Sequence, residues 1–184
     1  MMLPNRYTNT AIALHWLVAA LIAGAFPLGV YMADMALSPL KLKLFSYHKW
    51  LGVTIFLLAL ARLAWRAAHP PPALPATIPV WQQRAAHGIH WLLYLLPLVI
   101  PLTGWLMSSA KGFQTVYFGV LPLPDLVGKD EALAGLFQQS HILLNLALAL
   151  LVLGHVGAAL KHQFVERDGI LARMLPFLDK GSLR

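Results

Sequence analysis

Residues 137–160 form a run of 24 positions in which two histidines are the only acidic or basic side chains. A helix needs about 20 mostly apolar residues to cross a bilayer, so this run constrains the fold more than any other feature of the chain. Three further segments are similarly apolar, and the predicted spans are residues 10–32, 45–65, 85–107 and 137–160. Because main-chain polar groups in lipid must be satisfied within each segment, we expect an all-α, integral membrane four-helix bundle.

The composition agrees with this interpretation. Hydrophobic residues make up 59% of the 184 positions and charged residues only 11%, whereas a soluble domain carries about 25% charged residues. We expect one transmembrane domain over residues 1–184, with a tail at 161–184. The absence of cysteine excludes disulfides and cysteine-ligated iron–sulfur clusters. The net charge of +7 forms no basic stripe with interleaved aromatic residues, so we expect no nucleic-acid partner.

The positive charges predict the topology. The side shared by the N-terminus, the second connector and the tail carries Arg6, Arg62, Arg66, Arg84, Lys161, Arg167, Arg173, Lys180 and Arg184. The other side carries Lys41, Lys43, Lys49, Lys111 and Lys129. Nine charges against five predict that both termini lie in the cytoplasm. The first apolar run holds His15 and Trp16 and lacks a small-residue cleavage site, so we interpret it as a retained helix.

Four of the histidines inside the predicted spans lie at two matched depths. His141 and His155 are fourteen residues apart in the fourth span, which places them on nearly the same helix face about 21 Å apart. By depth, His155 matches His15 near the cytoplasmic side, and His141 matches His48 near the other side. Polar side chains are costly at such depths and usually mark a function. Two imidazole pairs would satisfy the irons of two b haems, whereas zinc would need further ligands that the spans do not offer.

Other histidines leave alternatives open. His90 lies at the same level as His15 and competes with it for the inner iron, and His87 lies one turn nearer the surface on the same face. His162 follows His155 by seven residues, on the same stripe; it is either an ordinary interfacial residue or a hydrogen-bond donor to a quinone carbonyl. His69, in a proline-rich connector, is expected at the surface.

Several other residues predict local structure. Pro97 and Pro101 each remove a main-chain donor and should kink the third span. The connector at 108–136 is long and should fold onto the outer surface, with Asp130 capping a short helix that leads into the fourth span. The tryptophans near the span ends, Trp16 and Trp50 among them, suit an aromatic belt, and we assign them no chemistry.

These residues resemble the bacterial cytochrome b561 family, whose four-helix membrane cytochromes are related to the cytochrome b subunits of nickel–iron hydrogenases. The resemblance covers nearly the whole chain. It is carried by the HWL sequence at 15–17, HKWLG at 48–52, RLAWRAAHPPP at 62–72, the histidines at 87 and 90, those at 141 and 155, and ALKHQFVERDGILARM at 159–174.

The resemblance implies two b haems held by His15, His48, His141 and His155, with ubiquinone near His162. A chain of this kind moves electrons between a periplasmic donor and the quinone pool. One branch of the family acts as a superoxide oxidase, that is, a superoxide:ubiquinone oxidoreductase. The basic side chains of Lys41, Lys43 and Lys49 around His48 would suit that role by concentrating a small anion. The same lysines would equally suit a solvated loop that touches lipid headgroups.

Two other functions remain open from the sequence. The first is a haem-bearing membrane anchor and electron-transfer subunit for a partner dehydrogenase such as a hydrogenase, which would dock on residues 108–136. The second is a transporter or structural bundle without redox chemistry, which predicts a colourless protein.

Overall fold

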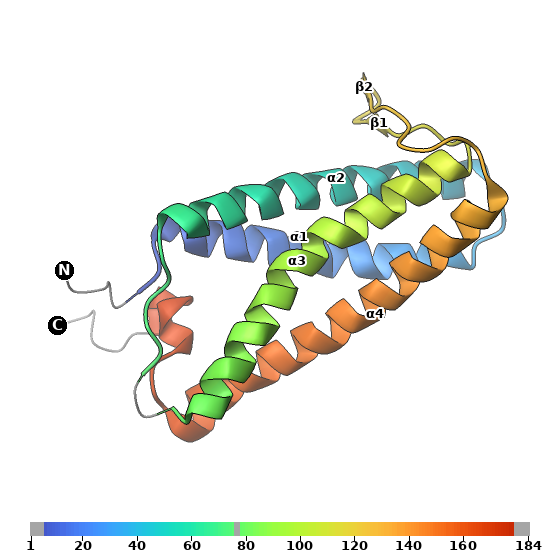
Figure 1. The fold of residues 1–184 in the computed structure, drawn as a ribbon. Helices are drawn as coiled ribbons and strands as arrows, with labels where there is room; N and C mark the ends of the chain where they lie inside the picture. The colour runs from blue at the N-terminus through green and yellow to red at the C-terminus, as the bar shows by residue number, and fades with distance from the viewer. Residues whose placement is uncertain (1–5, 76–77, 179–184) are drawn as a thin grey trace.

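The structure is a computed structural model that describes residues 6–75 and 78–178. Four long helices account for most of the chain (Figure 1): α1 (Asn9–Ala33), α2 (Pro39–Ala68), α3 (Val80–Ala110) and α4 (Glu131–Lys161). Each is long and apolar enough to cross a membrane. The predicted membrane four-helix bundle is therefore confirmed. Lys180 and Arg184, which entered the charge count, lie outside the described residues.

Helices α2, α3 and α4 begin five or six residues before the predicted spans, and the caps of α2 and α4 lie outside the apolar runs. Ser38 accepts a hydrogen bond from the Lys41 main-chain N–H, and Pro39 follows it as the first helical residue of α2. Asp130 accepts from the Leu133 N–H at 3.0 Å. Asp130 was expected to cap a short separate helix, but it caps α4 itself, which continues without interruption into the fourth span.

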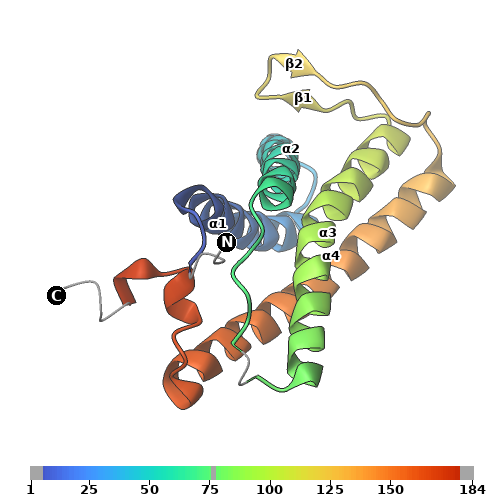
Figure 2. The ribbon, with the colours of Figure 1, turned by 60° about the vertical axis from the view of Figure 1, so that its left-hand side comes forward.

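The helices pack in chain order, α1 on α2, α2 on α3 and α3 on α4. Figures 1 and 2 show α1 beside α2 and α3 beside α4, with the two pairs crossing. The apolar core centres on Leu96 and Ile100 of α3 and Leu148 of α4. Within the described part of the chain, α4 has no close main-chain packing on α1 or α2 comparable to its packing on α3. Helix α4 therefore approaches α1 and α2 mainly through side chains.

Helix α3 runs through both internal prolines, Pro97 and Pro101. Each proline removes one main-chain N–H from the helical ladder. Figure 1 shows α3 changing direction along its length, as the prolines predict.

The connector between α3 and α4 contains a small antiparallel hairpin, β1 (Val116–Tyr117) and β2 (Leu121–Pro122), in which Tyr117 pairs with Leu121. Figures 1 and 2 both place the hairpin beside one end of α2, on the side away from α4. We call this end of the bundle the loop end, and the opposite end, near Arg6 and Leu178, the termini end.

The tail folds back across the termini end. Helix α4 continues as a π-helical turn, η1 (His162–Glu166), and two 3₁₀ turns follow, η2 (Leu171–Arg173) and η3 (Pro176–Leu178). The Trp16 indole N–H donates to the Met174 carbonyl at 3.0 Å, and Arg173 donates to the Ala73 carbonyl at 2.7 Å. The tail is thereby joined to α1 and to the connector after α2.

Candidate functional site

The loop-end histidine pair is formed by His48 of α2 and His141 of α4. Their ring centres lie 6.2 Å apart and their planes are inclined by 80°. The two rings border a small hollow of about 50 Å³ between the helices, which is also lined by Gly52, Pro101 and Asn145.

A glycine packs against each ring of this pair. A Cβ atom built on Gly29 of α1 would lie 3.0 Å from Cε1 of His48. A Cβ atom on Gly104 of α3 would lie 3.1 Å from Cε1 of His141. Such contacts are tighter than most real Cβ contacts, so a larger residue at either position would displace the ring by a few tenths of an ångström.

The second nitrogen of each loop-end ring faces main chain. Nδ1 of His141 lies 3.0 Å from the Ile100 carbonyl and 3.0 Å from the Thr103 hydroxyl, which itself donates to that carbonyl. Nδ1 of His48 is buried and makes no hydrogen bond of good geometry with a described residue; the Ala25 carbonyl is the main-chain acceptor within its reach. A carbonyl partner keeps the proton on Nδ1, which leaves the Nε2 lone pair for a metal.

The termini-end pair is formed by His15 of α1 and His155 of α4, with ring centres 6.3 Å apart and planes inclined by 68°. His90 of α3 also approaches His155, and the centres of these two rings lie 5.4 Å apart. All three histidines thus converge at one level, as their predicted depths require.

The ring separations provide a test of fit for iron. Metal–nitrogen bonds of about 2 Å to two opposed imidazoles place the ring centres about 6.3 Å apart. The His48–His141 and His15–His155 separations match this value, whereas the His90–His155 separation is shorter by nearly one ångström. By ring separation, the two pairs match a metal held between them.

Arginine side chains distinguish the termini end from the loop end. A guanidinium nitrogen of Arg62 lies 2.9 Å from Nδ1 of His15. Arginine only donates, so in this arrangement Nδ1 accepts and the ring proton lies on Nε2. Arg62 and Arg66 also lie over the Tyr94 ring, at 4.6 and 4.9 Å from its centre. Among the described residues neither arginine forms an ion pair with a carboxylate, so the site is suited to an anionic group.

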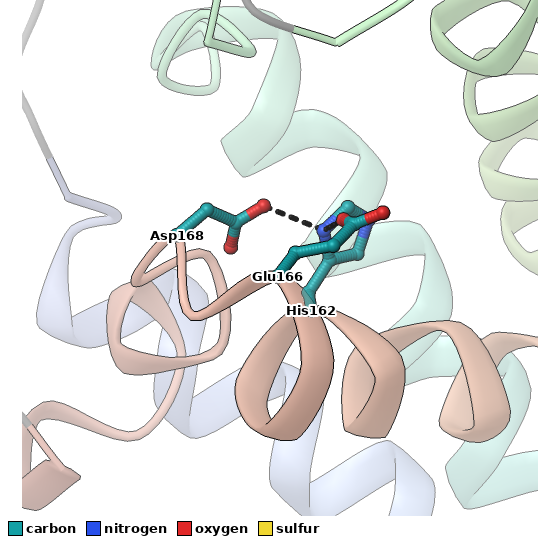
Figure 3. A group of neighbouring side chains, drawn as sticks. All are labelled: His162, Glu166 and Asp168. Carbon is teal, nitrogen blue, oxygen red and sulfur yellow. Dashed lines mark hydrogen bonds and ion pairs between the residues drawn. The ribbon is translucent and has the colours of Figure 1, made fainter.

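His162 lies at the end of α4 between two carboxylates (Figure 3). Its Nδ1 is 2.6 Å from an Asp168 oxygen and 2.5 Å from a Glu166 oxygen. Lys161 forms a further ion pair with Glu166 at 2.7 Å. The side chains of His162 and Asp168 are each only 19% exposed, so the pair is shielded from bulk water although it lies at a helix end. The carboxylates occupy Nδ1 and leave Nε2 for a further partner.

The three lysines expected to guide an anion have different surroundings. Lys41 donates to the Ala33 and Met35 carbonyls at the end of α1, and Lys49 donates to the Phe113 and Gln114 carbonyls of the long connector. Lys43 is exposed and lies over the Tyr47 ring at 5.8 Å. Two of the three ammonium groups therefore hold chain segments in place, a role that sequence reasoning missed.

The remaining histidines lie outside both pairs. His69 is exposed and stacks on Trp65 with ring centres 4.0 Å apart. His87 is exposed, and its Nδ1 lies 3.0 Å from the Gln83 carbonyl.

The tryptophans do more than mark the membrane interface. The indole N–H groups of Trp16, Trp50 and Trp105 donate to carbonyls of the tail and of the long connector, and that of Trp65 donates to the Thr8 hydroxyl. No sequence signal separates such contacts from an aromatic belt, because the partners are distant in the chain.

Comparison with known proteins identifies the family. The profile of the prokaryotic cytochrome b561 family matches residues 6–177. The chain is 33% identical over 174 residues to cytochrome b561 homolog 2 of Escherichia coli K12, an alignment that covers 94% of this chain and 92% of the relative. It is 30% identical to a probable superoxide oxidase of Yersinia pestis, covering 94% and 97% of the two chains. Cytochromes of this family are membrane electron-transfer proteins that bind b-type haem. The chain therefore belongs to the prokaryotic cytochrome b561 family.

Proposed function

We propose that this membrane cytochrome holds two b haems, one between His48 and His141 and one between His15 and His155, and transfers electrons between a donor at the loop end and the ubiquinone pool at the termini end. The observation that carries the proposal is the pair of matched separations, 6.2 and 6.3 Å, between rings from different helices. Both pairs draw one ring from α4, at positions about 21 Å apart along its axis.

The ring separations favour His15 over His90 as the partner of His155. The Arg62 contact bears on this choice, because iron at Nε2 of His15 requires the proton to leave that nitrogen. Arg62 can then turn from Nδ1 toward another acceptor. A b haem carries two propionate carboxylates, and Arg62 with Arg66 offers two positive charges without carboxylate partners among the described residues.

When bound, the haems supply one-electron redox chemistry, which the protein adjusts through ligands, hydrogen bonds and charge. The chain's own groups orient the rings. The Ile100 carbonyl holds Nδ1 of His141, and Gly104 lets that ring pack against α3.

His162 is the proposed quinone contact. Quinone reduction consumes two electrons and two protons, and Nδ1 of His162 is hydrogen-bonded to Asp168 and lies within ion-pair distance of Glu166 at the end of α4. Its Nε2–H would donate to a quinone carbonyl, and Asp168 and Glu166 would return the proton from water. Histidine is the side chain that most often transfers protons in enzymes.

Superoxide is the proposed donor, which would make the protein a superoxide:ubiquinone oxidoreductase. The support is the name of the Yersinia relative and the basic side chains of Lys41, Lys43 and Lys49 near His48. The proposed orientation, with both termini in the cytoplasm of the inner membrane, places these lysines on the periplasmic side.

Pyridine haemochrome quantification of the purified protein tests the haem proposal. We expect two haems per chain in the wild type and in His90→Ala, and one in each of His15→Ala, His48→Ala and His141→Ala. His155→Ala should lose the termini-end haem. Two haems in His15→Ala with one in His90→Ala would assign the inner iron to His90, and a colourless wild type would end the proposal.

Stopped-flow mixing with superoxide and a soluble ubiquinone tests the donor. Superoxide should reduce the isolated protein, and the electrons should pass to quinone. A haem-loaded protein that is inert toward superoxide would instead support the alternative, an anchor and electron-transfer subunit for a partner dehydrogenase.

A further inference from the structure

The loop-end hairpin has an unusual composition for a segment between two membrane helices. Residues 113–124 contain no charged side chain, although Lys111 and Asp125 flank them closely. The most exposed side chains of the hairpin are apolar: Phe118 is 57% exposed, Val120 81% and Leu121 54%. A loop that projects into water would ordinarily carry polar residues at these positions.

The turn of the hairpin holds a bulky residue in a strained conformation. Phe118 and Gly119 have φ angles of 50° and 74°, and the Val120 N–H donates to the Tyr117 carbonyl across them. Positive φ is ordinary for glycine but rare for an aromatic residue, and asparagine or aspartate usually takes this place in such turns. The sequence therefore presents an aromatic side chain at the tip at a conformational cost, which points to a role for that side chain.

Side chains of α2 fix the hairpin well below the start of that helix. The Trp50 indole N–H donates to the Val116 carbonyl at 2.7 Å, and the Thr54 hydroxyl is hydrogen-bonded to the Tyr117 hydroxyl at 2.9 Å. Thr54 lies eleven residues beyond the exposed Lys43, a rise of about 16 Å along the helix. The hairpin thus flanks the level of His48 and does not stand above the end of the bundle.

The face of α2 that carries the hairpin is aromatic and points away from the bundle core. Tyr47, Trp50 and Thr54 follow one another at helical spacing, whereas Ile55 and Ala59 are the buried residues of α2. Phe118 packs on Trp50 with ring centres 5.3 Å apart, and Tyr47 packs on Trp50 at the same distance. Aromatic side chains of this kind gather at the boundary between headgroups and acyl chains.

We infer that the β1–β2 hairpin inserts its tip into the interfacial layer of the bilayer at the loop end, with Phe118, Val120 and Leu121 against the lipid. The apolar tip is continuous with the lipid-facing surface of α2. The interface, and not the hydrocarbon centre, is the level that fits, because a two-stranded hairpin leaves main-chain groups that need water or headgroups. This inference rests on the membrane fold and does not depend on the haem or quinone proposals.

Site-directed spin labelling tests the inference on the full-length, haem-loaded protein in liposomes. The chain has no cysteine, so Val120→Cys gives a single labelling site without further changes. The matched control is Asp125→Cys, an exposed position five residues away in the same connector. Molecular oxygen enriches in lipid and a neutral nickel chelate enriches in water, so the ratio of their collision rates reports the environment of each label.

We expect the oxygen-to-nickel ratio at position 120 to exceed that at position 125 about tenfold, as for a side chain at the headgroup–acyl boundary. Equal ratios at the two positions would overturn the inference and would leave the tip free for a soluble partner. If Val120→Cys does not accumulate with the haem content of the wild type, Leu121→Cys replaces it, since that side chain is also exposed. In detergent-free nanodiscs the oxygen-to-nickel ratio at position 120 should again exceed that at position 125. A reversed order there would likewise refute lipid contact.

Discussion

Replacing Gly104 with alanine should disturb the loop-end haem site through the ring of His141. The added Cβ would lie 3.1 Å from Cε1 and 3.4 Å from Nδ1 of that ring, so one of the two must move by a few tenths of an ångström. The ring cannot move freely, because its Nδ1 lies 3.0 Å from both the Ile100 carbonyl and the Thr103 hydroxyl.

The expected cost follows from these contacts. Weakening the Nδ1 hydrogen bond costs about 1 kcal/mol, and altering a group that orients a metal ligand typically lowers metal affinity by about 10–100-fold. Gly104→Ala should therefore lose haem from the loop-end site on dilution or mild dialysis, while the termini-end haem stays bound. Haem content by pyridine haemochrome and the low-temperature α-band spectrum measure the two sites.

Gly24→Ala in α1 is the matched control, because a Cβ there meets nothing within 4 Å. Both substitutions gain the same helix propensity, about 1 kcal/mol, so the difference between them isolates the packing effect. A Gly104→Ala protein that retains both haems as firmly as Gly24→Ala, with an unshifted spectrum, would refute the reasoning.

Three further substitutions have defined outcomes. Arg62→Gln removes a positive charge beside His15, so the midpoint potential of the termini-end haem should fall by roughly 50 mV, equivalent to about 1 kcal/mol, in a redox titration; an unchanged potential would contradict this. Asp168→Asn keeps an acceptor for the Ile170 N–H but cannot carry a proton, so quinone reduction should slow about tenfold with both haem spectra intact. Loss of a haem in the Asp168→Asn variant would argue against a role of Asp168 in quinone reduction alone. Trp16→Phe removes the donor to the Met174 carbonyl, so the tail should be cleaved faster by added protease, at a cost of about 1 kcal/mol of local stability.

Hydropathy and helical periodicity were sufficient to predict the four helices and the two histidine levels. The pairing of His48 with His141 needs only a depth for each residue, because four antiparallel helices leave few ways to oppose rings at one level. Helix starts were less well predicted. The Ser38–Pro39 signal is present in the sequence, but Lys41 and Lys43 interrupt the apolar run and moved the expected start of the span inward.

The supporting contacts lay outside sequence reasoning. The glycines that pack on the rings are Gly29 and Gly104, each on a helix adjacent to the one that carries the histidine. The arginine contact to His15 comes from α2, 47 residues along the chain. Such contacts depend on the exact rotation of one helix against another. A sequence pattern indicates which face of a helix is buried but does not define that rotation.

The two ends of the bundle treat their histidines differently, and the difference bears on the direction of electron flow. At the loop end the rings are held by glycine, a hydroxyl and main-chain carbonyls, which carry no net charge. At the termini end Arg62 contacts His15, and Arg66 lies beside it over Tyr94. A positive charge favours the reduced state of a nearby redox centre, since reduction adds an electron. With a haem between each pair, the arginines would raise the potential of the termini-end haem and so favour electron flow from the loop end toward His162, while Lys41, Lys43 and Lys49 near His48 would oppose part of this difference. Bound haem propionates would offset part of the arginine charge. The change in the midpoint potential of the termini-end haem in Arg62→Gln therefore measures how much of that charge remains.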